Sequence, residues 1–148
     1  MGQPNRREFL KVVGAAACAC AMGPGLAEAA DAADPVDIGT IADYPADGVY
    51  DALARSHKLL VMRHEGRLYA CTAACTHKSQ TLRVKDGQLG CPAHSSKFSI
   101  DGTPTGGPAK RALDRFAITR RDDGHFAVDR SRTFEQAKWD DPDAHVKL

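Results

Sequence analysis

The sequence has few aromatic residues, almost no net charge and no apolar run long enough to cross a membrane. Only 6% of its 148 residues are Phe, Trp or Tyr, and its formal net charge at pH 7 is +1. A disordered chain would combine high net charge with low hydrophobicity, and a general nucleic-acid binder would be strongly basic. Neither composition is present, and the length predicts a single domain with one hydrophobic core.

The chain also lacks an internal repeat and, after its first 29 residues, any segment with a convincing 3.6-residue hydrophobic period. Short apolar runs separated by turn residues are present instead, and they predict β-hairpins at residues 58–71 and 115–129. The acidic stretch from residue 30 to about 51 is punctuated by prolines and predicts a linker that leads into an edge strand at about 36–41. Together these patterns predict an antiparallel, all-β domain.

Cysteine is scarce, and the number of cysteines argues against a disulfide framework. Five are present, but Cys18 and Cys20 lie in a segment that we predict to be removed. The remaining three, Cys71, Cys75 and Cys91, are an odd set, and a metal site with one thiol left over fits them better than paired disulfides. Cys71 falls in a predicted strand, where we expect it to pack as a small buried hydrophobe.

The first 29 residues have the layout of an export signal. Arg6 and Arg7 are followed by a weakly apolar, Ala-rich run at residues 12–26 and by a small-residue site, Ala-Glu-Ala, at residues 27–29. Glycines and a proline interrupt the run, which falls short of the roughly 20 apolar residues of a membrane span. The paired arginines resemble the twin-arginine signal, whose family carries folded, often cofactor-loaded proteins across the bacterial inner membrane. The resemblance implies contact with the twin-arginine translocase during export and a periplasmic protein, with membrane contact only if the signal is retained.

These features divide the chain into three predicted parts. Residues 1–29 are the signal peptide, residues 30–130 form the domain, and residues 131–148 are a C-terminal tail that holds the only tryptophan, Trp139. We assign no function to the tail.

Two short boxes in the middle of the domain each supply one thiol and one imidazole. Cys75 and His77 are separated by one residue, and Cys91 and His94 by two, with thirteen residues between the boxes. A mononuclear zinc site could use all four side chains. The same donors could hold a 2Fe–2S cluster in which the cysteines bind one iron and the histidines the other. Ligand count alone leaves both possibilities open.

The residues in and after the two boxes resemble those of the Rieske family, and the resemblance covers roughly residues 59–129. The matching segments are Cys-Thr-His-Lys at 75–78, Cys-Pro-Ala-His-Ser-Ser-Lys-Phe at 91–98, Asp-Gly at 101–102 and Gly-Gly-Pro-Ala at 106–109. The family implies a Rieske-type antiparallel β-sandwich or barrel with a cluster-binding loop subdomain, here at about 71–110. It also implies a 2Fe–2S cluster covered by the Gly/Pro-rich loop.

Carried over residue by residue, the resemblance makes Cys75 and Cys91 the ligands of the inner iron and His77 and His94 those of the outer iron. Ser96 matches the serine that donates a hydrogen bond to a bridging sulfide. Neutral imidazoles in place of two thiolates favour the reduced cluster, which raises the potential to between roughly −150 and +300 mV. Bound imidazoles also allow a proton to move together with the electron.

The sequence departs from the family pattern in three ways. In quinol-oxidising members a disulfide joins an extra cysteine of the first box to one of the second. Here none of residues 79–81 is cysteine and position 93 is alanine, so this disulfide is not possible. Phe98 replaces a tyrosine that raises the potential, and Ser95 replaces the usual glycine. With one hydrogen-bond donor kept and one lost, our hypothesis is an intermediate potential, which a redox titration would test. The short gap between the boxes requires a tight hairpin at about 82–89.

Charge is unevenly distributed along the chain. Residues 78–121 contain nine Lys or Arg and three acidic residues. This is either an ordinary solvated face or a cationic surface that steers an acidic partner toward the cluster. The four remaining histidines have no ligand spacing, and we predict surface or turn positions for His57, His64, His125 and His145.

The resemblance predicts one-electron transfer with a redox protein partner, by a periplasmic carrier or by the small subunit of a larger oxidoreductase. A Rieske oxygenase would need a second iron domain, for which the residues after Asp129 are too few, and a quinol-oxidising subunit would need a disulfide and a membrane anchor. The alternative from another class is a zinc-stabilised binding module that uses the same four ligands. Colour and electron paramagnetic resonance (EPR) separate the two.

Overall fold

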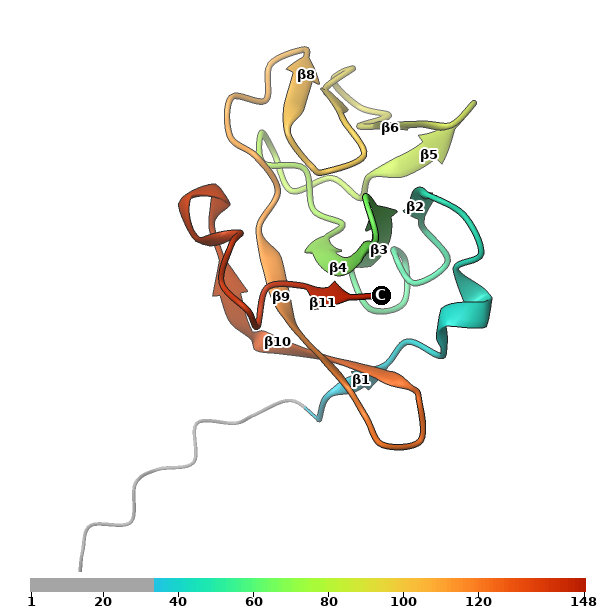
Figure 1. Ribbon diagram of the computed structural model, residues 1–148. Helices are drawn as coiled ribbons and strands as arrows, with labels where there is room; N and C mark the ends of the chain where they lie inside the picture. Colours follow the sequence, from blue (N-terminus) through green and yellow to red (C-terminus); the bar gives the residue numbers. More distant parts are fainter. Residues whose placement is uncertain (1–33) are drawn as a thin grey trace, which may run out of the picture. The chain divides into compact units, whose positions relative to one another are not determined.

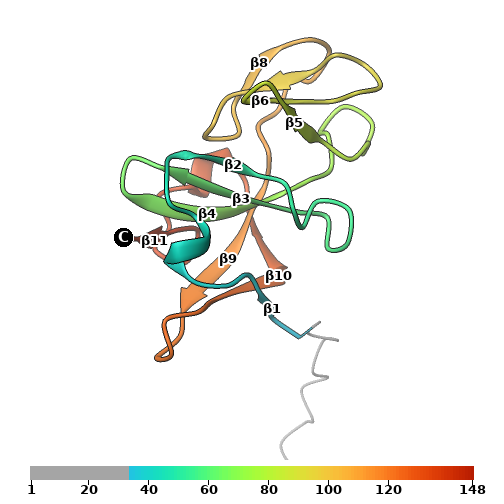
Figure 2. The ribbon, with the colours of Figure 1, turned by 90° about the vertical axis from the view of Figure 1, so that its right-hand side faces the viewer.

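Residues 34–148 are described in a computed structural model and fold into two antiparallel β-sheets (Figures 1 and 2). The larger sheet has the order β1-β10-β9-β4-β3-β2, with β11 paired to β4, and the smaller has the order β5-β6-β7-β8. This arrangement confirms the predicted all-β, antiparallel fold. The predicted export signal lies outside the described residues.

The strands are short, as the turn-rich sequence predicts. Their bounds are β1 Val36–Asp37, β2 Gly48–Tyr50, β3 Leu59–His64, β4 Arg67–Thr72, β5 Arg83–Lys85, β6 Gln88–Gly90, β7 Lys97–Phe98, β8 Pro104–Gly106, β9 Arg115–Arg120, β10 Phe126–Phe134 and β11 Val146–Lys147. The helical elements of the described part are two 3₁₀ turns, η1 Ile41–Asp43 and η2 Gln136–Lys138. Neither is long or apolar enough to span a bilayer.

The three predicted hairpins form β3–β4, β5–β6 and β9–β10. The first turns at Glu65-Gly66 and the second at Asp86-Gly87, and all four residues have positive φ. Two consecutive positive φ values define the type I′ turn, whose twist matches that of paired strands. The predicted edge strand is β1, which pairs with β10 at the border of the larger sheet.

Strand β3 is buried on both faces, which explains why its sequence is continuously apolar. Leu60 and Met62 point into one core, while Leu59 and Val61 point into another. Successive side chains of a strand alternate between faces, so a sheet covered on both sides needs apolar residues at every position.

The first of these cores joins the two sheets. Tyr69 and Cys71 of β4 share it with Leu82, Leu89 and Phe98 from the smaller sheet and its flanks. The smaller sheet is thus supported by direct packing on the larger one. Cys71 is completely buried in this core, as the sequence predicts.

The predicted C-terminal tail contributes to the larger sheet. It contains the end of β10, η2 and β11, and Trp139 lies over the guanidinium of Arg115 at 4.0 Å from the ring centroid. Tyr69 covers the same guanidinium at 3.8 Å. The prediction of a surface position for His145 is wrong: the segment before β11 folds against the sheet and buries this residue, and burial lowers the pKa of its imidazole.

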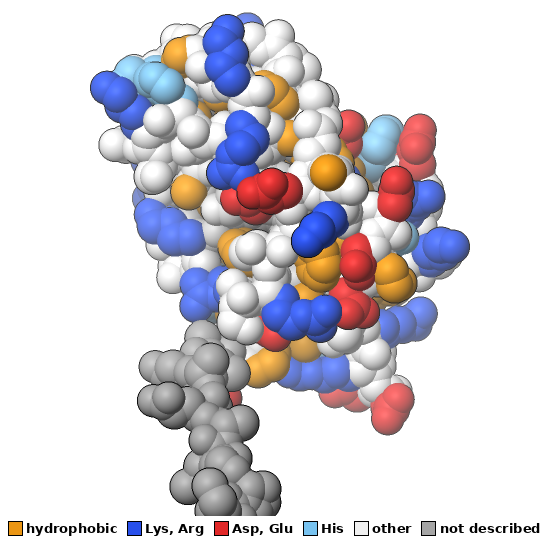
Figure 3. Space-filling view, turned by 90° about the vertical axis from the view of Figure 1, so that its left-hand side faces the viewer, with side chains coloured by type: hydrophobic (Ala, Val, Ile, Leu, Met, Phe, Trp, Pro, Cys, Tyr) orange, Lys and Arg blue, Asp and Glu red, His pale blue; other side chains and the backbone are white. Residues whose placement is uncertain are grey.

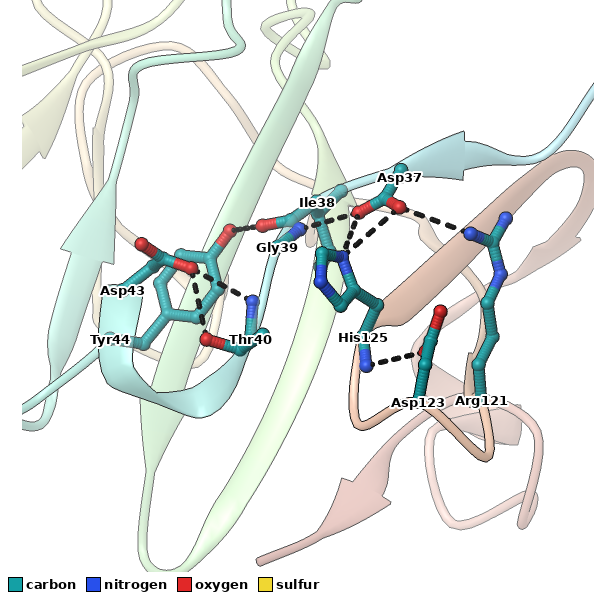
Figure 4. A network of polar contacts seen from close by, with 9 residues as sticks. All are labelled: Asp37, Ile38, Gly39, Thr40, Asp43, Tyr44, Arg121, Asp123 and His125. Atoms are coloured by element: carbon teal, nitrogen blue, oxygen red, sulfur yellow. Dashed lines mark hydrogen bonds and ion pairs between the residues drawn. The ribbon is translucent and has the colours of Figure 1, made fainter.

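Strand β1 is tied to the β9–β10 hairpin by a surface network of charged groups (Figure 4). The Asp37 carboxylate accepts hydrogen bonds from Arg121 at 3.0 Å and from the backbone N–H of Gly39 at 2.8 Å. It also lies 3.1 Å from Nδ1 of His125. The hydrogen bond to Asp37 is the main cause that raises the pKa of His125. The hydrogen bond from the backbone N–H of Gly39 is the main cause that lowers the pKa of Asp37.

Candidate functional site

The two boxes lie on loops at the end of the molecule that carries the smaller sheet (Figure 1). The first loop follows β4, and the second connects β6 to β7. Backbone hydrogen bonds close both loops in the same way. The N–H of Cys75 donates to the carbonyl of Gln80 (2.8 Å), and the N–H of Ser79 donates to the carbonyl of Cys75 (2.8 Å).

The second box repeats this pattern at the same spacing. The N–H of Cys91 donates to the carbonyl of Ser96 (2.8 Å), and the N–H of Ser95 donates to the carbonyl of Cys91 (3.1 Å). Ser79 and Ser95, each four residues after the cysteine, have φ values of 53° and 58°. A left-handed residue at this position lets each loop turn back on its own cysteine.

The loops bring their imidazoles together above buried thiols. Cys75 and Cys91 are 2% and 4% exposed, and neither forms a disulfide. The rings of His77 and His94 have centroids 5.0 Å apart and meet edge to face at 81°. His77 is exposed and His94 half-buried, so histidine edges reach the surface while the sulfur atoms lie inside.

This set of donors fits an iron–sulfur cluster. The Nδ1 atom of His94 is buried without a hydrogen-bond partner, and a buried polar atom is destabilising unless something binds it. A 2Fe–2S cluster needs two protein ligands on each iron, and the two thiols and two imidazoles of the boxes supply that number.

One segment, residues 106–111, joins the two boxes in place of a disulfide. The hydroxyl of Thr76 in the first box donates to the carbonyl of Arg111 (2.7 Å). The hydroxyl of Ser96 in the second box is fully buried and accepts from the N–H of Ala109 (3.2 Å). Both loops are thus hydrogen-bonded to the same short segment.

Gly107 brings this segment into direct contact with the second box. A Cβ atom at this position would lie 2.6 Å from the carbonyl oxygen of Ser95 and 2.6 Å from the Cα of Ser96. The residue also has a φ of 80°, which glycine tolerates best. The contact requires the absence of a side chain.

Sequence reasoning identified the four candidate ligands and Ser96 but missed the roles of Thr76 and Gly107. The matched form of the two loops has a signal in the sequence, because serine follows cysteine by four residues in both boxes, C-T-H-K-S-Q and C-P-A-H-S-S. The partner of Thr76 lies 35 residues away and has no such signal.

Cys71 and the remaining histidines lie outside the site. Burial raises the pKa of the Cys71 thiol to about 12, so it stays protonated at neutral pH and is poorly suited as a ligand or nucleophile.

The family model for the Rieske 2Fe-2S domain matches residues 34–117. The ferredoxin component of the alkene monooxygenase system of Xanthobacter autotrophicus is 35% identical over 77 residues, which cover 49% of this chain and 63% of that protein. The cytochrome b6-f complex iron-sulfur subunit of Chlorobaculum tepidum is 30% identical over 73 residues, which cover 48% of this chain and 40% of that protein. The chain therefore spans less than two thirds of the length of these curated relatives.

A solved structure resembles the fold as well. The plasma membrane Rieske protein of the cyanobacterium Synechocystis PCC 6803 superposes with a TM-score of 0.51 and 28% identity, over 63% of this chain and 97% of that one. The family match covers more than half of the sequence, includes both boxes, and agrees with the paired loops and the buried thiols. The chain belongs to the Rieske 2Fe-2S domain family.

Proposed function

We propose that this protein transfers single electrons through a 2Fe–2S cluster bound by Cys75, His77, Cys91 and His94, as a periplasmic carrier or a small subunit of a larger oxidoreductase. The observation that carries the proposal is the pair of matched loops, which present two buried free thiols and two adjacent imidazoles. When bound, the cluster supplies a one-electron redox couple whose potential depends on its mixed ligands.

The protein's own residues hold the ligands and set their surroundings. The hydrogen bonds of Thr76 and Ser96 to residues 106–111 fix the distance between the boxes. Because the Ser96 oxygen accepts from Ala109, its O–H proton can be donated to a sulfur atom of the cluster, which would favour the reduced state. The exposed edges of the imidazoles form the shortest path to a partner.

The names of the relatives support a carrier or subunit role. One is a ferredoxin component of a monooxygenase system, and the other is an iron–sulfur subunit of a cytochrome complex. Each is thus a part of a larger redox assembly. This chain is proposed to exchange electrons with a redox protein partner in the same general manner.

Export is the second part of the proposal, and it rests on the sequence of residues 1–29. The arginine pair and the Ala-Glu-Ala site support transport by the twin-arginine route into the periplasm. Replacing Arg6 and Arg7 by lysine should leave the cluster-loaded protein in the cytoplasm of the expressing bacterium, as measured by cell fractionation. Unchanged periplasmic recovery of the double variant would contradict this route.

Metal analysis and EPR test the electron-transfer proposal. The purified protein should be coloured, contain iron and acid-labile sulfide in equal amounts, and give a rhombic EPR signal after reduction by dithionite. Cys91→Ser should lose the signal, whereas Cys71→Ser should keep it, because only the former thiol is proposed to be a ligand. A colourless, EPR-silent protein that contains zinc would overturn the proposal.

A further inference from the structure

We infer that the cationic surface beside the candidate cluster loops is the docking site for an acidic face of a protein redox partner. The inference rests on the proposed function and names the chemistry of the partner. Three features of the molecule support it: the distribution of charge, the exposure of the charged groups and a groove beside the second box.

Charge divides sharply between the two ends of the described molecule. Residues 75–111 contain six Lys or Arg and two Asp, a net charge of +4. The other described residues contain eleven Lys or Arg and fourteen Asp or Glu, a net charge of −3. The nearly neutral total therefore conceals a charge asymmetry whose positive end holds the proposed ligands.

The positive groups of this end are free to meet a partner. Five are exposed, and none of the five forms an ion pair within residues 34–148: Lys78, Arg83, Lys85, Lys97 and Lys110. The sixth, Arg111, pairs with Asp114. Of the two acidic groups, Asp101 is part-buried and accepts hydrogen bonds from Ser99 and Thr103, whereas Asp86 is exposed and lies in the groove, where the cations still outnumber it.

Three of these cations line one groove. Arg83, Lys85 and Lys97 surround a depression of about 820 Å³ whose floor includes Cys91 and Ser96 of the second box. In Figure 3, several blue Lys and Arg side chains lie at the upper end of the molecule near pale-blue histidine side chains, and further blue side chains lie among red ones in the lower half. A carboxylate-bearing segment seated in the groove would contact the loop that carries His94, although the lining of the groove includes neither His94 nor His77.

The surface suits a protein better than a nucleic acid or a membrane. The groove contains no aromatic side chain on which bases could stack, as single-strand binders require. Membrane-surface binding needs exposed apolar anchors next to the cations, and Leu148, on the other sheet, is the one large apolar side chain exposed in residues 34–148.

A positive surface around the electron exit has a kinetic consequence. Oppositely charged partners associate roughly 10- to 1,000-fold faster than neutral ones at low salt, and screening removes the advantage. The Debye length falls from about 30 Å at 0.01 M salt to about 8 Å at 0.15 M, so the gain should disappear within this range.

Small oxidants of opposite charge probe this surface without a known partner. The reduced cluster-loaded protein gives one electron either to ferricyanide, an anion, or to tris(phenanthroline)cobalt(III), a cation, and stopped-flow absorbance follows the transfer. We expect the ferricyanide rate to fall about tenfold between low and high salt and the cobalt rate to rise. The triple variant Arg83→Glu, Lys85→Glu and Lys97→Glu should reverse the sign of both salt dependences.

A matched control variant makes the same change in net charge, but outside residues 75–111. Arg120, Lys138 and Lys147 are also exposed and form no ion pair within the described part of the chain. Their triple replacement by glutamate should leave the sign of both salt dependences unchanged. Equal effects of the two triple variants would overturn the inference, because the charge near the groove would then have no special role.

A competition experiment tests the class of the partner. Poly-L-glutamate should slow the ferricyanide reaction of the wild-type protein and of the control variant, but not that of the groove variant. Tighter binding of a single-stranded oligonucleotide or of phosphatidylglycerol vesicles than of poly-L-glutamate would overturn the inference. Failure of the loaded protein to reduce either oxidant would instead overturn the proposed function, and the docking inference with it.

Discussion

Gly107 and Ser96 show how closely the segment at 106–109 is fitted to the second cluster loop. Gly107 has no side chain, which leaves room for the close contact, and Ser96 provides a buried hydroxyl. In both cases the contact joins segments that are more than ten residues apart in the chain. Two substitutions separate their effects.

Gly107→Ala should destabilise the loaded protein by about 1–3 kcal/mol, because the new Cβ would overlap backbone atoms that cannot move independently. Urea unfolding and the iron content after purification measure the loss. Gly66→Ala is the matched control, since Gly66 also has a positive φ (70°) and no atom lies within 4 Å of the position that a Cβ would occupy there. Equal losses in the two variants would show that the close contact at residue 107 has no special importance.

Ser96→Ala should have two effects that differ in origin. The buried N–H of Ala109 would lose its acceptor, at a cost of about 1–3 kcal/mol in unfolding free energy. The cluster would lose a proposed hydrogen-bond donor, which should lower its midpoint potential in a redox titration. Thr76→Val, which removes the other tie to residues 106–111, should reduce stability with a smaller change in potential. A Ser96→Ala potential equal to that of the wild type would contradict the proposed donor role.

At the scale of elements, we expect the attachment of β1 to depend on pH. His125 in the β9–β10 hairpin faces Asp37 of β1, with Arg121 and Asp123 as the other charged neighbours (Figure 4). Because the pKa of His125 is raised, the stabilisation that His125 provides is complete below its ordinary pKa of 6.5. This stabilisation is lost as pH rises through the raised pKa. The lowered Asp37 pKa means that its contribution is present above 3.8 and is lost as pH falls through the lowered value.

The pair should therefore stabilise β1 most between about pH 4 and pH 6.5. Replacing His125 by Gln should flatten the loss of unfolding free energy that accompanies a rise in pH from 6 to 8. Chemical unfolding at a series of pH values measures the effect, with His57→Gln as a control outside the network. A wild-type stability that is unchanged across this range would show that the pair contributes nothing.

The hairpins could be predicted from the sequence, whereas the burial of His145 could not. Hairpins were predictable because alternating apolar residues and turn residues such as Asp86-Gly87 are local signals. The burial of His145 was not predictable, because it depends on β11 pairing with β4, about 78 residues earlier in the chain. Sequence patterns describe neighbours along the chain well and pairings between distant segments poorly.

At the scale of the whole molecule, the site depends on two sheets. Strand β3 of the larger sheet is buried on both faces, each sheet carries one of the two loops, and the sheets pack on each other through a shared core. The ligand set remains a prediction from the boxes, and the uneven charge is visible in the sequence, whereas the contacts of residues 106–111 with both loops required the fold. Hydrogen bonds connect both loops to this one segment.

The most direct test of the account is electron–nuclear double resonance on the reduced protein grown with ¹⁵N-labelled histidine. We predict couplings from two histidine nitrogens to the cluster, unchanged in His64→Gln and lost or halved when His77 or His94 is replaced by cysteine. A signal without nitrogen coupling, or couplings that survive both replacements, would contradict the assignment of His77 and His94 as ligands.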